Sequence, residues 1–373
     1  MHDILNRIAL SSHEEVDLLE TLASDLSENE FYNLKKSVLS IFIKNKKMLN
    51  FILEKNLYTW EISTILKKSN DLWFFNGLML LIEDLKAAFH IDNNSFIKTI
   101  EDDYMDIHEA LNAYHDSYFL QNIPKDARLR HFTRSCFRHI GDTIEATFKP
   151  HVSMIYNLLK TGNNIKLFTS RKPSFGDHVS SLLELDYLKK IYVDELKGIS
   201  LSQWRNISQH SSYRVDEDTN TIICTYGNKK SSTFTPLDIE QVMVKLDEIH
   251  SIHTIAISFI MLEFNDKINL NTDITHLSID TIIGDICSNL STYQYPVIEI
   301  KEEGKKYKFI ILDKNSGLKP KFIKALNQVS SQIFMLNEKG IFPLFGLYSV
   351  SGNKIAEGKL DFPNSKKKTH VAS

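Results

Sequence analysis

The sequence predicts a mainly α-helical fold in three parts. These are a helical module over residues 1–124, a four-helix bundle with a hairpin-like insertion over residues 125–264, and a small α+β domain over residues 265–362. Apolar residues recur at three- and four-residue spacing through most of the first two parts, which is typical of helices packed on a core. Strand-like patterns with turn signals gather near residues 213–234 and after residue 295.

The composition is that of a globular protein, and it excludes several classes of protein. The chain has 373 residues, of which 42% are hydrophobic and 24% charged, so we expect two or three domains. The three cysteines are widely separated and fit neither a disulfide framework nor a structural zinc site. There is no leader-like N-terminus and no apolar run long enough to span a bilayer. We therefore expect a cytoplasmic protein.

The first part, residues 1–124, predicts one helix after another. It contains a single glycine, Gly77, and no proline before Pro124. It is also acidic, with 11 basic and 20 acidic side chains. His108 and His115 lie two helical turns apart beside acidic residues, an arrangement that suits either a metal site or a polar helix face. We favour the polar face, and we expect this module to serve regulation or recognition.

The second part begins near residues 122–130, where Pro124 is followed by a cluster of arginines. Helical patterns follow around residues 140–160, interrupted by Pro150, and over residues 175–197, where Ser174 and Asp177 predict a capped start. Residues 213–234 carry β-prone residues around turns and predict a loop or short hairpin. Thr235-Pro236-Leu237-Asp238 then predicts the start of a long helix.

The third part, residues 265–362, mixes the two kinds of pattern. Residues 276–290 predict a helix, and two strands are expected around Glu303-Gly304. A further hairpin is expected around Ser351-Gly352-Asn353. Residues 363–373 are rich in lysine and polar residues and predict a disordered tail. No ligand for this domain can be named from its sequence.

The chemistry-bearing candidate is the stretch SQWRNISQHSSY, residues 202–213. It places Arg205, Asn206 and His210 within six residues. The spacing alone carries little weight, because Arg7–His13, Arg134–His139 and Arg171–His178 satisfy the same pattern. Only Arg205 is followed directly by an amide, preceded by Trp204 and succeeded by a strand-like insertion and a well-capped helix.

Helix geometry limits how Arg205 and His210 can act together. Asn206 and His210 are four residues apart and share a helix face, whereas Arg205 and His210 differ by about 140° in direction. One uninterrupted helix cannot aim both at one small target. Either the helix ends near His210, or the target is a long groove, or two chains build the site together.

Residues 125–264, with this motif, resemble a HEPN domain, a four-helix bundle whose ribonuclease members carry Arg, four to six residues of any kind, then His. The resemblance implies a metal-independent endoribonuclease in which Arg205, Asn206 and His210 are catalytic. RNA supplies its own 2′-hydroxyl nucleophile, so neither a metal nor another cofactor is expected, and the product is a cyclic phosphate. The resemblance also implies a homodimer with two facing motifs, and a toxin or an antiviral defence effector.

Four further residues are candidates for RNA binding. They follow the motif and offer stacking or phosphate contacts to single-stranded RNA: Tyr213, Arg214, Lys229 and Lys230. A different reading of the motif stays open. In it the bundle is a catalytically inactive HEPN binding or assembly module, with Arg205 paired to a carboxylate and His210 buried against Trp204. Motifs for phosphate-cradling loops, nucleophile elbows and HExxH zinc sites are absent from the sequence.

Overall fold

The computed structural model describes residues 17–19, 21–22, 25–55, 57–120, 128–162, 173–268, 278–314 and 319–358. These residues are mostly helical. A small sheet precedes the long helix that begins at Pro236, and a second sheet lies near the end of the chain. The prediction of a mainly α fold with a C-terminal α+β domain is therefore confirmed. Among all the residues that the structure describes, no helix is both long enough and apolar enough to cross a membrane. The predicted tail, residues 363–373, lies outside the described residues.

The chain divides into two compact units. Unit 1 comprises residues 1–37, 50–66 and 272–373, and unit 2 comprises residues 38–49 and 67–271. The boundary expected near residue 124 does not separate these units, because helices from both sides of it pack together in unit 2. Helices α2 (Glu28–Phe42) and α3 (Lys46–Lys55) each contribute residues to both units.

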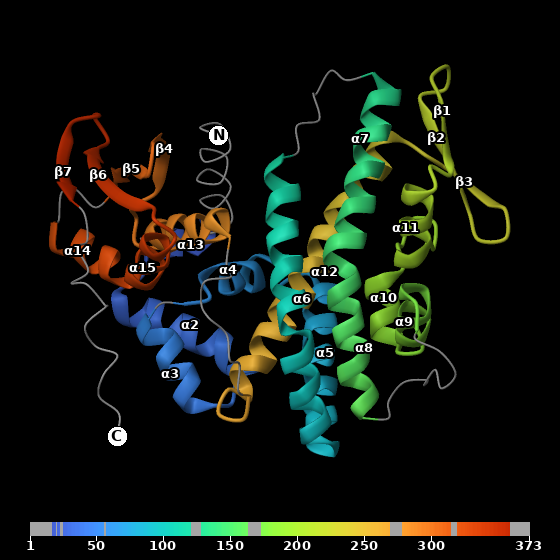
Figure 1. Cartoon of the computed structure of the whole chain (residues 1–373), viewed down its shortest axis with the longest axis horizontal. Helices are drawn as coiled ribbons and strands as arrows, with labels where there is room; N and C mark the ends of the chain where they lie inside the picture. The colour runs from blue at the N-terminus through green and yellow to red at the C-terminus, as the bar shows by residue number, and fades with distance from the viewer. Residues whose placement is uncertain are drawn as a thin grey trace. The chain divides into compact units, whose positions relative to one another are not determined.

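Long helices form the body of unit 2 and lie side by side in Figure 1. They are α5 (Leu72–Ile91), α6 (Asn93–Leu120), α8 (Lys149–Thr161) and α12 (Pro236–Glu263). Helix α5 packs on α8 and α12, and α6 packs along α8. The core between them contains fully buried apolar side chains: Leu78, Leu81, Leu85, Ile155, Ile252, Ile255 and Phe259. Two of the long helices thus come from the segment predicted as the N-terminal module.

Pro150 does not interrupt the helix that contains it. Helix α7 (Leu129–Asp142) continues through a π-helical segment, η1 (Thr143–Phe148), into α8, where Pro150 occupies the first turn. A proline inside a regular α-helix clashes with the carbonyl four residues earlier and cannot donate a hydrogen bond. A wider π turn directly before it accommodates the ring without ending the helix. The sequence predicts an interruption at Pro150, whereas the structure has a local change of helical geometry.

Between α8 and α12 the chain forms short helices and a sheet. The helix expected over residues 175–197 divides into α9 (Phe175–Leu182) and α10 (Asp186–Tyr192), and α11 (Leu201–Gln209) follows. The expected hairpin is a three-stranded antiparallel sheet of β1 (Tyr213–Asp216), β2 (Thr221–Tyr226) and β3 (Lys230–Phe234). Both predicted helix starts are confirmed, since Ser174 with Asp177 and Thr235 with Asp238 form capping boxes.

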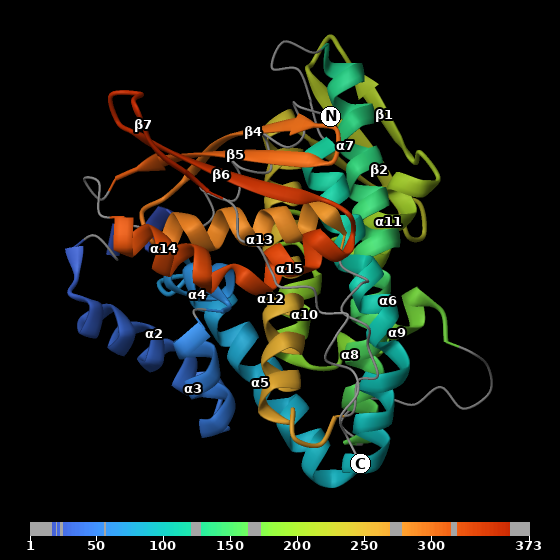
Figure 2. The same cartoon turned by 60° about the vertical axis from the view of Figure 1, so that its left-hand side comes forward.

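Unit 1 contains α4 (Thr59–Lys67), α13 (Ile279–Thr292) and a four-stranded sheet. The sheet order is β4 (Val297–Glu303), β5 (Lys306–Asp313), β6 (Phe342–Ser349) and β7 (Lys354–Gly358). The predicted turns at Gly304 and Gly352 join antiparallel pairs, and both glycines have positive φ. Strands β5 and β6 are parallel, so they need a crossover, which α14 (Lys319–Gln328) and α15 (Ser330–Glu338) provide. Figure 2 shows α13, α14 and α15 covering one face of this sheet.

Candidate functional site

The motif helix α11 ends at Gln209, directly before His210. His210 is the C-cap residue, with φ −97° and ψ 5°, and its backbone N–H donates to the Asn206 carbonyl at 3.1 Å. Asn206 and His210 are both exposed, as expected for residues that share a helix face. Of the three alternatives that helix geometry allows, the structure therefore has the first, in which the motif helix ends near His210. Geometry alone gives no further reason for a second chain at the site, and His210 is not buried against Trp204.

Asp194, in the loop before α11, fixes the position of the motif helix. Its side chain is 9% exposed. One carboxylate oxygen accepts a hydrogen bond from the Lys197 backbone N–H at 2.7 Å, and the other accepts from the Ile199 N–H at 2.7 Å and from the Trp204 indole N–H at 3.1 Å. A carboxylate with several well-placed donors is stabilised despite its burial. Asp194 therefore holds the loop and the first turn of α11 together.

Arg205 forms an ion pair with Glu145 from the π-helical segment. The Arg205 Nε–H donates to Glu145 Oε2 at 2.8 Å, and Lys149 Nζ donates to Glu145 Oε1 at 2.6 Å. The side chains of Arg205 and Glu145 are each 33% exposed. The Arg205 hydrogen bond, supported by Lys149, lowers the pKa of the Glu145 carboxyl despite its partial burial. One carboxylate thus orients two cations that solvent can reach.

Helices α7 and α11 are in close contact at Gly141. A β-carbon at this position would lie 3.1 Å from the Ser208 β-carbon and 3.2 Å from Gln209 Nε2. The Gly141 carbonyl also accepts a hydrogen bond from Gln209 Nε2 at 3.3 Å. The close contact brings the end of α7 against the residue that precedes His210. Because Glu145 lies one turn further along the same helix, α7 and η1 flank the motif at both Arg205 and Gln209.

The sheet places the predicted RNA-binding residues in two different settings. Tyr213 is half-buried, and one face of its ring stacks on Phe137 with centroids 4.3 Å apart. Arg214, Lys229 and Lys230 are exposed. The β2–β3 turn at Gly227 reaches α11, since a β-carbon there would lie 3.3 Å from Gln203 Nε2. Lys229 and Lys230 therefore lie at the end of the sheet nearest the motif helix. Tyr213 instead packs β1 against α7.

The competing Arg–His pairs differ from Arg205–His210 where the structure describes them. Arg134 is exposed on α7, whereas His139 is buried, and burial lowers the pKa of His139 to about 4. His178 is likewise buried and stacks on Tyr156. Arg7, His13 and Arg171 lie outside the described residues. Among the pairs that can be compared, only Arg205 and His210 are both accessible to solvent.

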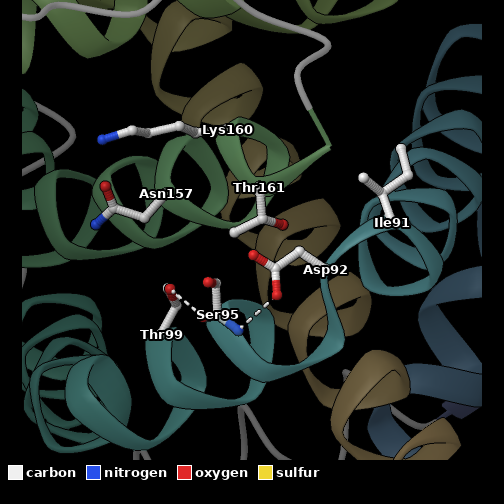
Figure 3. Close-up of a pocket in the computed structure, with 7 residues that line it drawn as sticks. All are labelled: Ile91, Asp92, Ser95, Thr99, Asn157, Lys160 and Thr161. Atoms are coloured by element: carbon white, nitrogen blue, oxygen red, sulfur yellow. Dashed lines mark hydrogen bonds between the residues drawn. The ribbon is translucent and has the colours of Figure 1, made fainter.

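A separate cavity of about 670 Å³ lies between the end of α5, the start of α6 and the end of α8 (Figure 3). It is lined by Ile91, Asp92, Ser95, Thr99, Asn157, Lys160 and Thr161. The Asp92 carboxylate accepts from the Ser95 backbone N–H at 3.0 Å, which identifies it as a cap of α6. None of the predicted site residues lines this cavity. Within the described ranges no group of three or more His, Cys, Asp or Glu residues is placed to hold a metal ion.

The structure adds three residues that the sequence reasoning missed: Glu145, Lys149 and Asp194. Glu145 and Lys149 are four residues apart on one continuous helix, a spacing that predicts an ion pair and could have drawn attention to this face. Nothing in the sequence connects this pair with Arg205, which lies 60 residues away. Asp194 carries no local signal, because its donors come from the loop that it organises.

We compared the chain with models of known protein families, with curated proteins and with solved structures, and none of the three comparisons finds a match. The resemblance to HEPN domains therefore depends on the motif residues and on the arrangement of strands and capped helix behind them.

Proposed function

We propose that this chain is an endoribonuclease that cleaves RNA internally by attack of the 2′-hydroxyl on the adjacent phosphate. The observation that carries the proposal is the pairing of Arg205 with Glu145, beside Lys149, next to an exposed histidine at the end of the same helix. Two cations and one carboxylate leave a net positive charge where a phosphate would bind. His210, the C-cap residue of the same helix, would supply the proton transfer that the reaction needs.

The roles follow from the chemistry of the side chains. The ion pair with Glu145 runs through Arg205 Nε, so the terminal NH₂ groups are the donors offered to a scissile phosphate. A guanidinium oriented in advance stabilises the charge that develops on the phosphoryl oxygens. Imidazole titrates close to neutral pH, and proton transfer by such a group is worth about 100 to 10,000-fold in rate. Asn206, exposed on the face of His210, would orient the imidazole or the phosphate.

The bonds balance without a further reagent. The 2′-oxygen forms a bond to phosphorus, the bond from phosphorus to the 5′-oxygen breaks, and a proton moves from the attacking to the leaving oxygen. The products are a 2′,3′-cyclic phosphate and a 5′-hydroxyl. Because RNA supplies the nucleophile, the reaction does not require a metal-bound water. A duplex holds the 2′-hydroxyl out of line with the leaving oxygen, so the proposed substrate is single-stranded RNA.

The wider setting is proposed on the resemblance. Active HEPN ribonucleases usually dimerise with two facing motifs and are commonly toxins or antiviral effectors whose activity must be controlled, and we propose the same for this chain. Such a role suits a cytoplasmic protein, and the three cysteines are free and buried, as a reducing compartment would keep them.

A second candidate function is that of a binding or assembly module without catalysis. The observation that favours it is the same Arg205–Glu145 pair, because a purely structural arginine would also be held by a carboxylate. The exposure of His210 at the end of the helix favours the enzyme, since a structural histidine would gain little there.

The two candidates differ in one experiment. Purified wild type is incubated with single-stranded RNA in EDTA, beside Arg205→Ala, His210→Ala and, as a matched control, His90→Ala, which replaces an exposed histidine on α5. We expect cleavage by wild type and by the His90 variant, and a loss of at least 100-fold in the other two. Products are checked for the cyclic phosphate. RNA binding without cleavage by a folded wild type would favour the binding module.

A further inference from the structure

Three arginines form an exposed face on α7. Arg130, Arg134 and Arg138 are four residues apart, so they lie on one side of the helix, and all three are exposed. The opposite side is buried in the core through Thr133, Cys136, Phe137 and Ile140. In the sequence this arginine cluster marks only an expected domain boundary, and the proposed function makes no use of it.

Strand β1 runs beside this helix. Tyr213, at the start of β1, stacks on Phe137, and Glu217, just beyond its end, lies 3.5 Å from Arg130. The strand therefore proceeds from the middle of α7 toward its N-terminal end. The positive charge of Arg134 also acts on the Tyr213 hydroxyl, partly opposing the rise in pKa that burial causes there. Arg214, the next residue of β1, is exposed, and because side chains alternate along a strand it lies on the face opposite Tyr213, away from α7.

One end of the α7–β1 pair meets the candidate site. Strand β1 begins three residues after His210, and the Ser212 backbone N–H donates to the Ile207 carbonyl of α11 at 2.9 Å. On the helix side, Gly141 contacts Ser208 and Gln209. A chain of phosphates entering the site beside His210 would therefore continue along the arginines of α7.

The acidic partners of these arginines are weak competitors for a phosphate. Arg138 lies 3.6 Å from Asp142 and Arg130 lies 3.5 Å from Glu217, and all four side chains are at least 58% exposed. Exposed pairs of this kind are weak and are screened by salt. For Arg134 no carboxylate lies within ion-pair distance among the described residues. Arginine also binds phosphate through a forked pair of donors.

We infer that Arg130, Arg134 and Arg138 of α7 form a phosphate-binding track for single-stranded RNA that leads to the Arg205–His210 site. The inference rests on the proposed function for its substrate. The track contacts nucleotides outside the scissile step, so it contributes to the affinity for long RNA and not to the chemistry. Contacts to phosphates alone give little sequence preference.

Binding and cleavage are measured separately to test the track. Binding of a labelled single-stranded RNA of 12 nucleotides is followed by fluorescence anisotropy in the full-length His210→Ala protein, which should not cleave it. We expect Arg134→Gln/Arg138→Gln, added to this protein, to weaken binding at least 10-fold. The slope of log Kd against log salt concentration should fall by about 0.7 for each lost phosphate contact. Lys190→Gln, which neutralises an exposed cation on α10, should leave both unchanged.

Cleavage is measured with His210 intact on the same 12-nucleotide RNA and on a dinucleotide that spans only the scissile phosphate. The double arginine variant should lose activity on the long RNA at low concentration and keep activity on the dinucleotide within about twofold. Equal binding by the double variant and the Lys190 variant would overturn the track, as would the absence of measurable RNA binding by the His210→Ala protein. If wild type binds RNA but cleaves neither substrate, the proposed nuclease fails while the binding result still decides the track.

Discussion

Replacing His151 with phenylalanine should make the stability of unit 2 less sensitive to acid. His151 lies in the core of the bundle on α8, fully buried, with its Nδ1 2.7 Å from the Thr147 carbonyl. Its Nε2 is buried without a hydrogen-bond partner. His253 on α12 stacks on it, with ring centroids 5.8 Å apart. The imidazole is therefore kept neutral, and burial lowers its pKa to about 4.

The sign and size of the effect follow from proton linkage. Between pH 6.5 and pH 4 the unfolded chain binds a proton at His151 while the folded chain does not, so wild type loses stability as the pH falls. A difference of about 2.5 pKa units corresponds to roughly 3 kcal/mol at pH 4. His151→Phe removes this loss. At pH 7 the variant should be about 1 kcal/mol less stable, because the hydrogen bond to Thr147 is gone.

Asp247→Asn provides a control of opposite sign. Burial raises the pKa of the Asp247 carboxyl to about 6, although it accepts a hydrogen bond from the Tyr114 hydroxyl at 3.1 Å. The folded chain then binds a proton before the unfolded chain does, so this carboxyl adds stability as the pH falls from 6 toward 3.8. Its replacement should steepen the acid-induced loss by about 2 kcal/mol at pH 4.

The assay is urea unfolding at pH 7, 6, 5 and 4, followed by tryptophan fluorescence. A Trp60→Phe background leaves Trp73 and Trp204, both in unit 2, as the reporters. His253 remains in all variants and keeps part of the acid sensitivity, so differences between variants are compared. Parallel stability curves for wild type and His151→Phe between pH 7 and pH 4 would refute the reasoning, because they would mean that His151 titrates alike in folded and unfolded chains.

Three further outcomes are expected. Glu145→Gln should lower RNA cleavage at least 10-fold, because Arg205 loses the carboxylate that orients it. The urea midpoint of unfolding should change little, because the substitution leaves the core packing intact. Unchanged cleavage would show that Arg205 needs no such partner. Asp194→Ala should lower the free energy of unfolding of unit 2 by about 2 to 4 kcal/mol, because the loop N–H groups and the Trp204 indole N–H lose their acceptor. A smaller change in urea unfolding would contradict the role of Asp194 in holding the loop to α11. Thr235→Ala removes the cap of α12 and should cost about 1 kcal/mol by the same measurement, whereas no change would mean that the Asp238 half of the capping box suffices.

The elements that could be predicted are those set by local chemistry. The capped starts at Ser174 and Thr235 depend on a residue three positions ahead, and the turns at Gly304 and Gly352 depend on residues that tolerate positive φ. Each signal lies within a few residues of the feature it specifies. Long apolar periodicity likewise identified α5 and α12 as packed helices.

The turn before β3 has positive φ at Gly227 and Lys229, and the sequence predicts only a loop or a short hairpin in this region. The packing of the helices depends on contacts that are distant in sequence, and local patterns do not show them. Nor does periodicity show that α5 packs on α8 and α12, because an apolar stripe does not name its partner. The same limit applies to the site. The motif could be selected from four candidates by its context, yet its carboxylate partner lies on another helix.

The π-helical segment before Pro150 makes the spacing of residues in this helix as important as their identity. In regular α geometry the same six residues, Thr143–Phe148, would turn every side chain of α8 by about 100° relative to α7, because an α turn holds fewer residues than a π turn. Either the buried face of α8 or the Glu145–Arg205 pair would then be out of phase. We therefore expect a single-residue deletion in this segment, which can return to α geometry, to keep the phase of α8, and a single-residue insertion to lose it, so the two length changes probe the site more sharply than point mutations on its surface.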